Sequence, residues 1–478
     1  MRTHQSDMIE QVLRKHLAIG CIFLGALVAA YVAWKRPFYV TDPKILGGLI
    51  LLEFVIAAVW LYRRVFLAVL LVGFLLAGTS TSMQGVWISA RWLLLIVGAL
   101  IGCVLVLTKH WLTFGLFHAV AILALLASLV SATVSQYPHT ALLKTSSIVL
   151  LFAYASTGAR IAYARSERNF FAGLRAGSEI LVVLIAGSYA LGMQILGNQN
   201  SLGAVMCFLA PVLLWSLLFD SAGHFRPLHI VVFSVCLMLL VYSQARAAML
   251  AAASSCGLLC LILRQYKLFI LGTVTLIVLT TGVSIVRPEI VDSLWTSIVF
   301  KGHEDKGFWN SRYSSWDRAR TNIEDHPWFG MGIGTTIESL HPQEQKDIFA
   351  SSGNVTAENG SSYLSLLSGV GVVGTIPFSL LLLILLVNIH RTMIWTWRSR
   401  SRCHPALPIA IVLVSGIIHA IFEDWMFAAG NYLCVWFWVV AFIFLDVAPR
   451  TSVQMTKGSL PEVTNRAKWF RTRKAAPA

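Results

Sequence analysis

The feature that most constrains this chain is a series of apolar runs, each long enough to cross a membrane, that recurs along almost its whole length. A helix of about 17–25 apolar residues spans the hydrocarbon core of a bilayer. Backbone polar groups in lipid must be bonded within the protein, which favours helices over open strands for these runs. The chain is 57% hydrophobic and only 12% charged. The sequence therefore predicts an all-α, polytopic membrane helix bundle.

Hydropathy predicts about 14 spans. Hydropathy alone can split one span or merge two neighbours, so the count is uncertain by one or two. The first group is expected at 17–33, 44–62, 65–80, 91–107, 111–131, 141–157, 176–196, 201–219, 228–244, 246–263 and 268–286. The second group is expected at 362–387, 408–422 and 427–446. The least certain divisions fall at 198–200 and 244–246.

One long polar segment separates the two groups of spans and gives the chain its predicted organisation. We expect a transmembrane bundle at 1–286, a large extramembrane loop with short helices at 287–361, transmembrane helices at 362–446 and a basic tail at 447–478. The loop is rich in Arg, Trp, Gly, Glu and Asn. A polytopic membrane protein that keeps one such loop commonly carries its chemistry there, so the functional site is expected in it.

The distribution of positive charge predicts the topology. When the segments between successive spans are assigned to alternate sides of the membrane, most of the 37 Lys and Arg residues fall on the side that holds both termini. The positive-inside rule then places both termini in the cytoplasm and residues 287–361 outside. The basic tail is typical of a topogenic segment beside anionic lipid. This distribution accounts for the formal net charge of +15 without a nucleic-acid partner.

The eight cysteines lie in or beside the expected spans, and the long loop contains none. Their spacing fits neither a disulfide framework nor a zinc site. We therefore expect no bound metal and no cofactor.

A short helix followed by a glycine-rich turn is expected in the loop. Ser311 is suited to cap a helix that begins near Arg312, and Trp316, Ala319 and Ile323 follow at helical spacing. This apolar stripe is suited to lie against the membrane domain.

The glycines that follow this helix, Gly330, Gly332 and Gly334, allow the backbone to turn its N–H groups toward an anion. Gly332 and Gly334 are therefore candidate binding residues. The alternative is an interfacial helix with a glycine turn that binds nothing.

Two arginines on the outer side are candidates for binding a polyanion. Arg246 stands between two apolar runs, where an arginine is costly and usually faces a cavity or a partner. Together with Arg312 it is suited to clamp phosphates, because guanidinium matches phosphate bidentately. The alternative for Arg246 is snorkelling to the interface. Asn200 lies in the polar break at 198–200, which a lined cavity would permit.

Two carboxylate positions are candidates for catalysis. Glu358 stands just before the span that opens at 362, where a general base can take a proton from a sugar hydroxyl. The alternative is a charge that interacts with the helix N-terminus. Glu423, followed by Asp424, lies at the outer end of the next-to-last span. We expect it within reach of the same outer site as Glu358. The alternative interpretation of Glu423 and Asp424 is an ordinary acidic pair at the membrane interface.

The order of these elements resembles the O-antigen ligase and polymerase superfamily of bacterial envelope glycosyltransferases. The resembling stretches are, in chain order, Asn-Ser-Leu-Gly, YSQARAAML, Arg-x-x-x-Trp, HPWFGMGIG, ENGSSYLSLLSGVGVVG and GIIHAIFEDWMFAAGN. They extend over residues 198–431. The ordered set carries the resemblance, since each stretch alone is a weak signal.

The resemblance implies an inner-membrane enzyme that binds an undecaprenyl-diphosphate-linked glycan at the periplasmic face and transfers it to a glycan or lipid acceptor. The acceptor hydroxyl displaces the lipid diphosphate without a metal or nucleotide. By position, Arg246 and Arg312 hold the diphosphate and Glu358 is the base, followed by Asn359. Many ligases have His-Asn at this place, so the glutamate favours an O-antigen or exopolysaccharide polymerase over a lipid A ligase.

The alternative class is a non-catalytic transporter or flippase of lipid-linked sugars. Such a protein needs polar or charged residues along its spans to line a crossing path. In this chain the candidates concentrate at one face, with Glu53 and Glu179 as the main exceptions. The distribution favours the enzyme.

The predicted topology is testable by thiol labelling. In intact spheroplasts, Ser339→Cys should react with a membrane-impermeant thiol reagent and Ser399→Cys should not, because the Lys and Arg bias places 287–361 outside. The mass shift of the protein reads the labelling. The reverse pattern would overturn the site assignment together with the topology.

Overall fold

The structure is a computed structural model that describes residues 66–81, 84–109, 112–136, 138–219, 226–286, 310–335, 360–399 and 404–449. In this part of the chain the regular structure is helical, with no strand. The prediction of an all-α protein is confirmed. The expected spans at 17–33 and 44–62 lie outside the described residues.

Most helix bounds lie within a few residues of the expected spans, but the helix expected at 176–196 begins at Arg160 and the one expected at 362–387 ends at Ser399. In chain order the elements are α4 (Phe66–Ala77), α5 (Gln84–Lys109), α6 (Leu116–Val134), α7 (Pro138–Tyr154), the π-helical turn η1 (Ala155–Ala159), α8 (Arg160–Ala190), α9 (Gln199–Phe219), α10 (Arg226–Tyr242), α11 (Arg246–Ile262), α12 (Tyr266–Val286), α14 (Asn310–Asp325), α15 (Ser362–Ser399), α16 (Ala406–His419) and α17 (Tyr432–Val447). Both uncertain divisions, at 198–200 and 244–246, are helix boundaries. The helix expected in the long loop is α14.

Apolar side chains cover the outside of the bundle as well as its core. Leu100, Leu184 and Ile376 are each more than half exposed, which suits a surface that faces lipid. Six described helices are long and apolar enough to cross a membrane, and five further apolar helices have 10–17 residues. The chain is therefore a multi-pass membrane protein. The expected count of about 14 spans is not confirmed.

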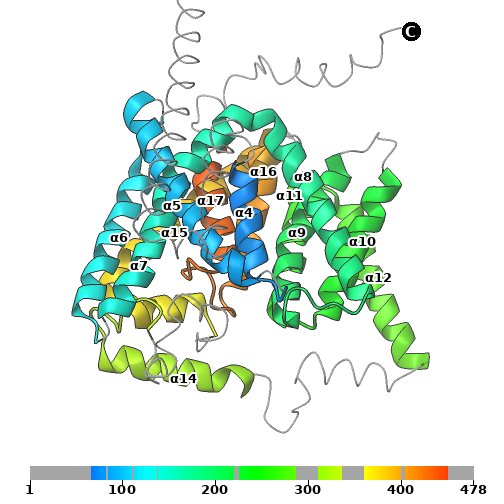
Figure 1. The fold of residues 1–478 in the computed structure, drawn as a ribbon. Helices are drawn as coiled ribbons and strands as arrows, with labels where there is room; N and C mark the ends of the chain where they lie inside the picture. Colours follow the sequence, from blue (N-terminus) through cyan, green and yellow to red (C-terminus); the bar gives the residue numbers. More distant parts are fainter. Residues whose placement is uncertain are drawn as a thin grey trace, which may run out of the picture.

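Several connections between the helices gather at one end of the bundle, which we call the loop end. It carries residues 78–81, 191–198, 243–245, 326–335 and 420–431, and α14 lies across it (Figure 1). Hydrogen bonds join connections that are distant in sequence, for example from the Ser80 N–H to the Ile195 carbonyl at 2.8 Å. Of the predicted site residues, those in the described part of the chain fall at this end.

Helix α15 is broken near its beginning, at Gly371, whose φ is 63°. The break leaves backbone groups that the helix cannot pair, and segment 326–335 bonds to them. Four backbone hydrogen bonds of 2.8–3.1 Å run from Val372 to Pro327, from Val373 to Trp328, from Met331 to Ser368 and from Gly332 to Gly369. A break in a membrane helix is tolerated when neighbouring protein groups satisfy it in this way.

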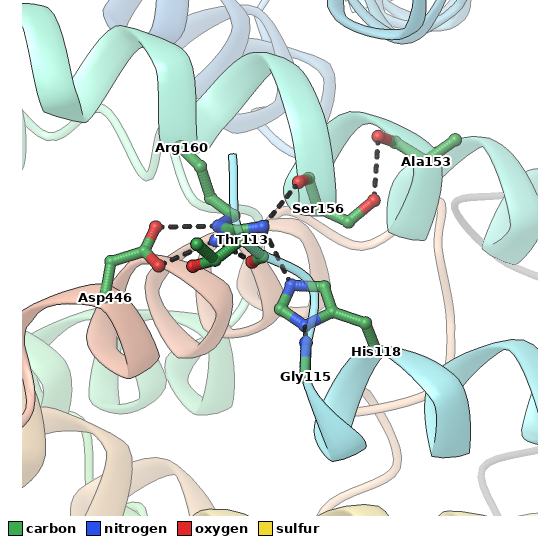
Figure 2. A network of polar contacts seen from close by, with 7 residues as sticks. All are labelled: Thr113, Gly115, His118, Ala153, Ser156, Arg160 and Asp446. Carbon is green, nitrogen blue, oxygen red and sulfur yellow. Dashed lines mark hydrogen bonds and ion pairs between the residues drawn. The ribbon is translucent and has the colours of Figure 1, made fainter. Parts of the chain in front are cut away.

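At the opposite end, one buried arginine joins three elements (Figure 2). Arg160 is 1% exposed, and its guanidinium donates two hydrogen bonds of 2.7 Å to the Asp446 carboxylate. It also contacts the His118 ring at 2.9 Å and the carbonyls of Thr113 and Ser156 at 2.8 and 3.2 Å. All three nitrogens of the guanidinium therefore contact protein groups. The network ties the start of α6 and the turn η1 to the last turns of α17.

This network predicts a specific pattern of stability. Arg160→Met should lower the free energy of unfolding by about 3 kcal/mol or more, because Asp446 loses its cationic partner in a largely buried place. Arg160→Met combined with Asp446→Leu should recover much of the loss, since no uncompensated charge remains. Thermal unfolding in lipid nanodiscs measures both. Arg320→Met, which breaks an exposed pair with Glu324, should change little. An equal loss in the single and the double variant would contradict the prediction.

Candidate functional site

The connection between α16 and α17, residues 420–431, forms the centre of the loop end, where Figure 1 shows it in orange-brown beneath α17. Ser362, the buried first residue of α15, holds it in place. The Ser362 N–H donates to the carbonyls of Ala420 and Glu423, and its hydroxyl donates to the Glu423 carbonyl at 2.7 Å. The same hydroxyl oxygen accepts the N–H groups of Trp425 and Met426, each at 3.0 Å. The start of α15 and this connection are thus one unit.

Aromatic side chains pack against the connection on the side of the bundle core. The Trp425 indole N–H donates to Nδ1 of His419 at 2.9 Å, and the Trp438 indole N–H donates to the Met426 carbonyl at 2.8 Å. Phe208 of α9 packs edge-on against Trp425. All these side chains are buried. This buried aromatic cluster therefore fixes the position of the connection and of its acidic residues.

Asp424 is the carboxylate that the structure bonds to α15. Its Oδ2 accepts a hydrogen bond from the Ser365 hydroxyl, and Lys144 of α7 is within electrostatic reach of it. Its neighbour Glu423 is partly buried in the same connection. The structure therefore places Glu423 and Asp424 together at the loop end.

The glycine turn after α14 fits closely between α6, α7 and α15. Gly330, Gly332 and Gly334 all have positive φ, which favours glycine. A Cβ added to Gly332 would lie 2.6 Å from the Ala141 Cβ and 2.7 Å from the Ser135 hydroxyl. The N–H groups of Gly330 and Gly332 donate to protein carbonyls. Gly332 therefore has a packing role. We expected its N–H to face an anion, but this N–H donates to the Gly369 carbonyl.

Ser131 of α6, Ser135 directly after α6 and Lys144 of α7 also bind this turn. The Ser131 hydroxyl donates to the carbonyls of Phe329 and Gly369, and the Ser135 hydroxyl donates to the Met331 carbonyl. Nζ of Lys144 donates to the Gly334 carbonyl at 3.0 Å. The turn, α15 and the two preceding helices are thus fixed against one another.

Asn200 and Arg246 lie on neighbouring turns because Gly203 has no side chain. A Cβ on Gly203 would lie 2.5 Å from the Ala245 Cβ and 2.7 Å from the Ser243 hydroxyl. The first turn of α9 can therefore approach the segment that opens α11. Both residues are partly buried. The first turns of α9 and α11 are therefore neighbours at the loop end.

Two further residues tie these turns to the acidic connection. Tyr432, the first residue of α17, is hydrogen-bonded to Ser201 beside Asn200. Arg91 of α5 is 3% exposed and donates to the Gly430 carbonyl at 2.7 Å. The Arg246 region, the acidic connection and α5 therefore meet at the loop end.

The remaining candidates belong to the long loop. Arg312 lies in the first turn of α14, a helix that packs against α15. The expected stripe on this helix is confirmed, because Ala319 is fully buried and Trp316 and Ile323 are partly buried. Glu358 and Asn359 lie outside the described residues, which resume at Gly360 beside the Ser362 contact.

Sequence reasoning missed Lys144, Ser362, Ser365 and Arg91. Each is an ordinary residue at a span end, and its role depends on contacts with distant segments. In the described part of the chain no group of three or more His, Cys, Asp or Glu is placed to hold a metal ion.

The fold and site define a multi-pass helical membrane protein with a polar site at one end. Residues 229–379 match the family model described as O-Antigen ligase. The resemblance to the O-antigen ligase and polymerase superfamily is confirmed, and the chain carries an O-antigen ligase domain. The matched segment contains Arg246, Arg312, the glycine turn and Glu358. A search of curated proteins gave no match. The family is one of membrane enzymes of glycosyl transfer that act on lipid-linked glycans and acceptors.

The packing of the glycine turn predicts a contrast between two glycines. Gly332→Ala should lower the free energy of unfolding by about 1–3 kcal/mol, because the methyl group overpacks the turn and φ stays positive. Gly187→Ala, in α8 with nothing within 4 Å of its Cβ, should cost nothing or stabilise the helix slightly. Thermal unfolding in nanodiscs measures both. Equal stability of the two variants would remove the packing role of Gly332.

Proposed function

We propose that this protein polymerises or ligates undecaprenyl-diphosphate-linked glycan at the periplasmic face of the bacterial inner membrane, with both termini in the cytoplasm. The observation that carries the proposal is the O-antigen ligase match over residues 229–379. Near its C-terminal end this segment is bonded to the acidic connection through Ser362 and Ser365. We further propose two transmembrane parts, 1–286 and 362–446, around the loop 287–361 and before the tail 447–478.

In the proposed reaction, Arg246 and Arg312 hold the donor diphosphate as bidentate partners. A carboxylate takes the proton of the acceptor hydroxyl, and the hydroxyl oxygen forms a bond to the anomeric carbon of the donor sugar. The bond from that carbon to the phosphate oxygen breaks, and its electron pair leaves with the lipid diphosphate. Glu358 is the proposed base, with Glu423 as the second carboxylate, and Asn200, Asn359 and Gly334 line the glycan and diphosphate site.

The surface of α15 suits a lipid-linked donor. A groove of about 280 Å³ follows the outer face of this helix. Its lining is almost wholly apolar: Leu367, Val372, Thr375, Ile376, Ser379, Leu380 and Leu383. The groove begins within one turn of Ser365, which bonds to Asp424. An isoprenoid chain can therefore lie in the membrane while its head group stays at the loop end.

A flippase is less well supported. The Glu179 carboxylate, inside one of the expected spans, lies 3.0 Å from Nδ1 of His229 in α10, and both side chains are largely buried. A carboxylate enclosed between two helices does not line an open path. Glu53 lies outside the described residues. The polar groups therefore support transfer at one face rather than passage across the membrane.

The decisive experiment compares carboxylate variants in glycan synthesis. Glu358→Gln should lower the rate about 10²–10⁴-fold, because the proton acceptor is lost while the shape is kept. Glu358→His should keep part of the activity, since an imidazole is also a base. Glu324→Gln, an exposed carboxylate on α14, is the matched control and should leave synthesis unchanged. Glycan chain length on gels, at equal protein in the membrane, gives the readout.

Normal chains from Glu358→Gln would dismiss Glu358 as the base, and Glu423→Gln and Asp424→Asn would then be compared. The same gels separate the two activities. Loss of the polymer ladder with single repeats still attached to lipid A indicates a polymerase, and loss of all attached glycan indicates a ligase.

A further inference from the structure

Lys144 is a cation that uses only part of its hydrogen-bonding capacity within the described residues. It lies near the start of α7, within a helical stretch, Pro138–Ala164, that is apolar enough to cross a membrane. Its ammonium has three N–H donors, and in the described part of the chain one of them is used, in the 3.0 Å bond to the Gly334 carbonyl. An ionisable group at such a position usually faces a cavity or a partner.

The turn that Lys144 contacts also has N–H groups for which the described residues supply no acceptor. The N–H groups of Gly330, Met331, Gly332 and Thr335 all donate to backbone carbonyls. Those of Ile333 and Gly334 donate to no other residue in the described part of the chain. Ile333 as a residue is 8% exposed, and Gly334 is exposed. Successive N–H groups in a turn of this kind form a concavity that binds anions.

The surroundings favour a phosphate over a carboxylate side chain as the anion. The carboxylate within electrostatic reach of Lys144 is Asp424, and this residue is already bonded to Ser365. A phosphate group offers several oxygens, so it can accept from the ammonium and from two backbone N–H groups together. These donors lie in one place because the α15 break fixes the turn beside α7.

We propose that Lys144 and the backbone N–H groups of Ile333 and Gly334 form a phosphate-binding subsite for the diphosphate of the lipid-linked donor. This inference rests on the proposed function and assigns a third cation to the site beside Arg246 and Arg312. As an ammonium, Lys144 stabilises the negative charge that grows on the leaving diphosphate as the bond to the anomeric carbon breaks.

Binding measurements on the full protein in phosphatidylcholine nanodiscs test the subsite without requiring turnover. Lys144→Gln removes the charge but keeps an N–H donor for the Gly334 carbonyl. It should raise the Kd for undecaprenyl diphosphate about tenfold or more, as the loss of a charge-assisted bond does. The Kd for undecaprenol, which lacks phosphate, should not change. Lys144→Arg should restore binding to within a few-fold of the native value.

Arg320→Gln is the matched control, because it removes one positive charge from the same end at an exposed position. Its Kd for undecaprenyl diphosphate should stay near that of the native protein. An unchanged Kd in Lys144→Gln would overturn the proposal. A rise of equal size in Arg320→Gln would also overturn it, because the effect would then reflect net charge alone.

A second measurement needs no variant. With ¹⁵N-labelled isoleucine and glycine in the native protein, the amide resonances of Ile333 and Gly334 should move downfield on addition of undecaprenyl diphosphate and stay in place with undecaprenol. Unmoved resonances at saturating diphosphate would overturn the subsite even if Lys144→Gln does not fold.

Membrane phospholipid carries the same phosphate chemistry, so a further arm adds phosphatidylglycerol to the nanodiscs. The donor assignment predicts less than about a twofold change in the native Kd, because the subsite is selective for the diphosphate. A larger rise that disappears in Lys144→Gln would assign the subsite to phospholipid and overturn the donor assignment. Diphosphate binding that depends on Lys144 in a protein that transfers no glycan would instead refute the proposed function alone.

Discussion

The loop end depends on the repair of one broken helix. Lipid offers no hydrogen-bond partners, so a membrane helix that breaks must find acceptors and donors in the protein. At Gly371 the break in α15 exposes two N–H groups and two carbonyls, and segment 326–335 supplies the four missing bonds. This exchange fixes the segment that follows α14 to a helix that begins far along the chain. Without the break, the glycine turn would lose its backbone bonds to α15 and keep only those from the side chains of Ser131, Ser135 and Lys144.

The repair has consequences for every neighbouring element. Gly369, whose carbonyl is bonded by Gly332, also accepts a hydrogen bond from Ser131 of α6. Further toward its start, α15 holds the connection 420–431 through Ser362 and Ser365. The break, the serines and the connection thus form one continuous set of hydrogen bonds. It places Asp424, Lys144 and the glycine turn together, although they come from segments nearly 300 residues apart.

The sequence predicted local features well and long-range pairing poorly. Apolar runs predicted the helices to within a few residues in most cases, and helical spacing predicted the buried stripe on α14, because both signals are periodic and local. The glycines of the turn were predicted to bind an anion, but two of their N–H groups bond within the protein. The partner carbonyls of Gly332 and its neighbour Met331 lie in α15, and neither spacing nor hydropathy reports such a pairing. Lys144 was missed for the same reason, since one lysine near a span end is ordinary until its partners are known.

The two ends of the bundle show how a buried charge can be interpreted from its hydrogen bonds. All three guanidinium nitrogens of Arg160 contact protein groups, among them both carboxylate oxygens of Asp446, so the protein itself surrounds this cation with partners. Lys144 has three N–H groups and uses one of them within the described residues, beside two backbone N–H groups without protein acceptors. Burying a charge in a membrane protein is costly in either case. A filled set of partners repays that cost in the folded protein itself, whereas an incomplete set is stable only when a ligand or water completes it. This difference, rather than depth or sign of charge, is what separates a structural cation from a binding one in this bundle.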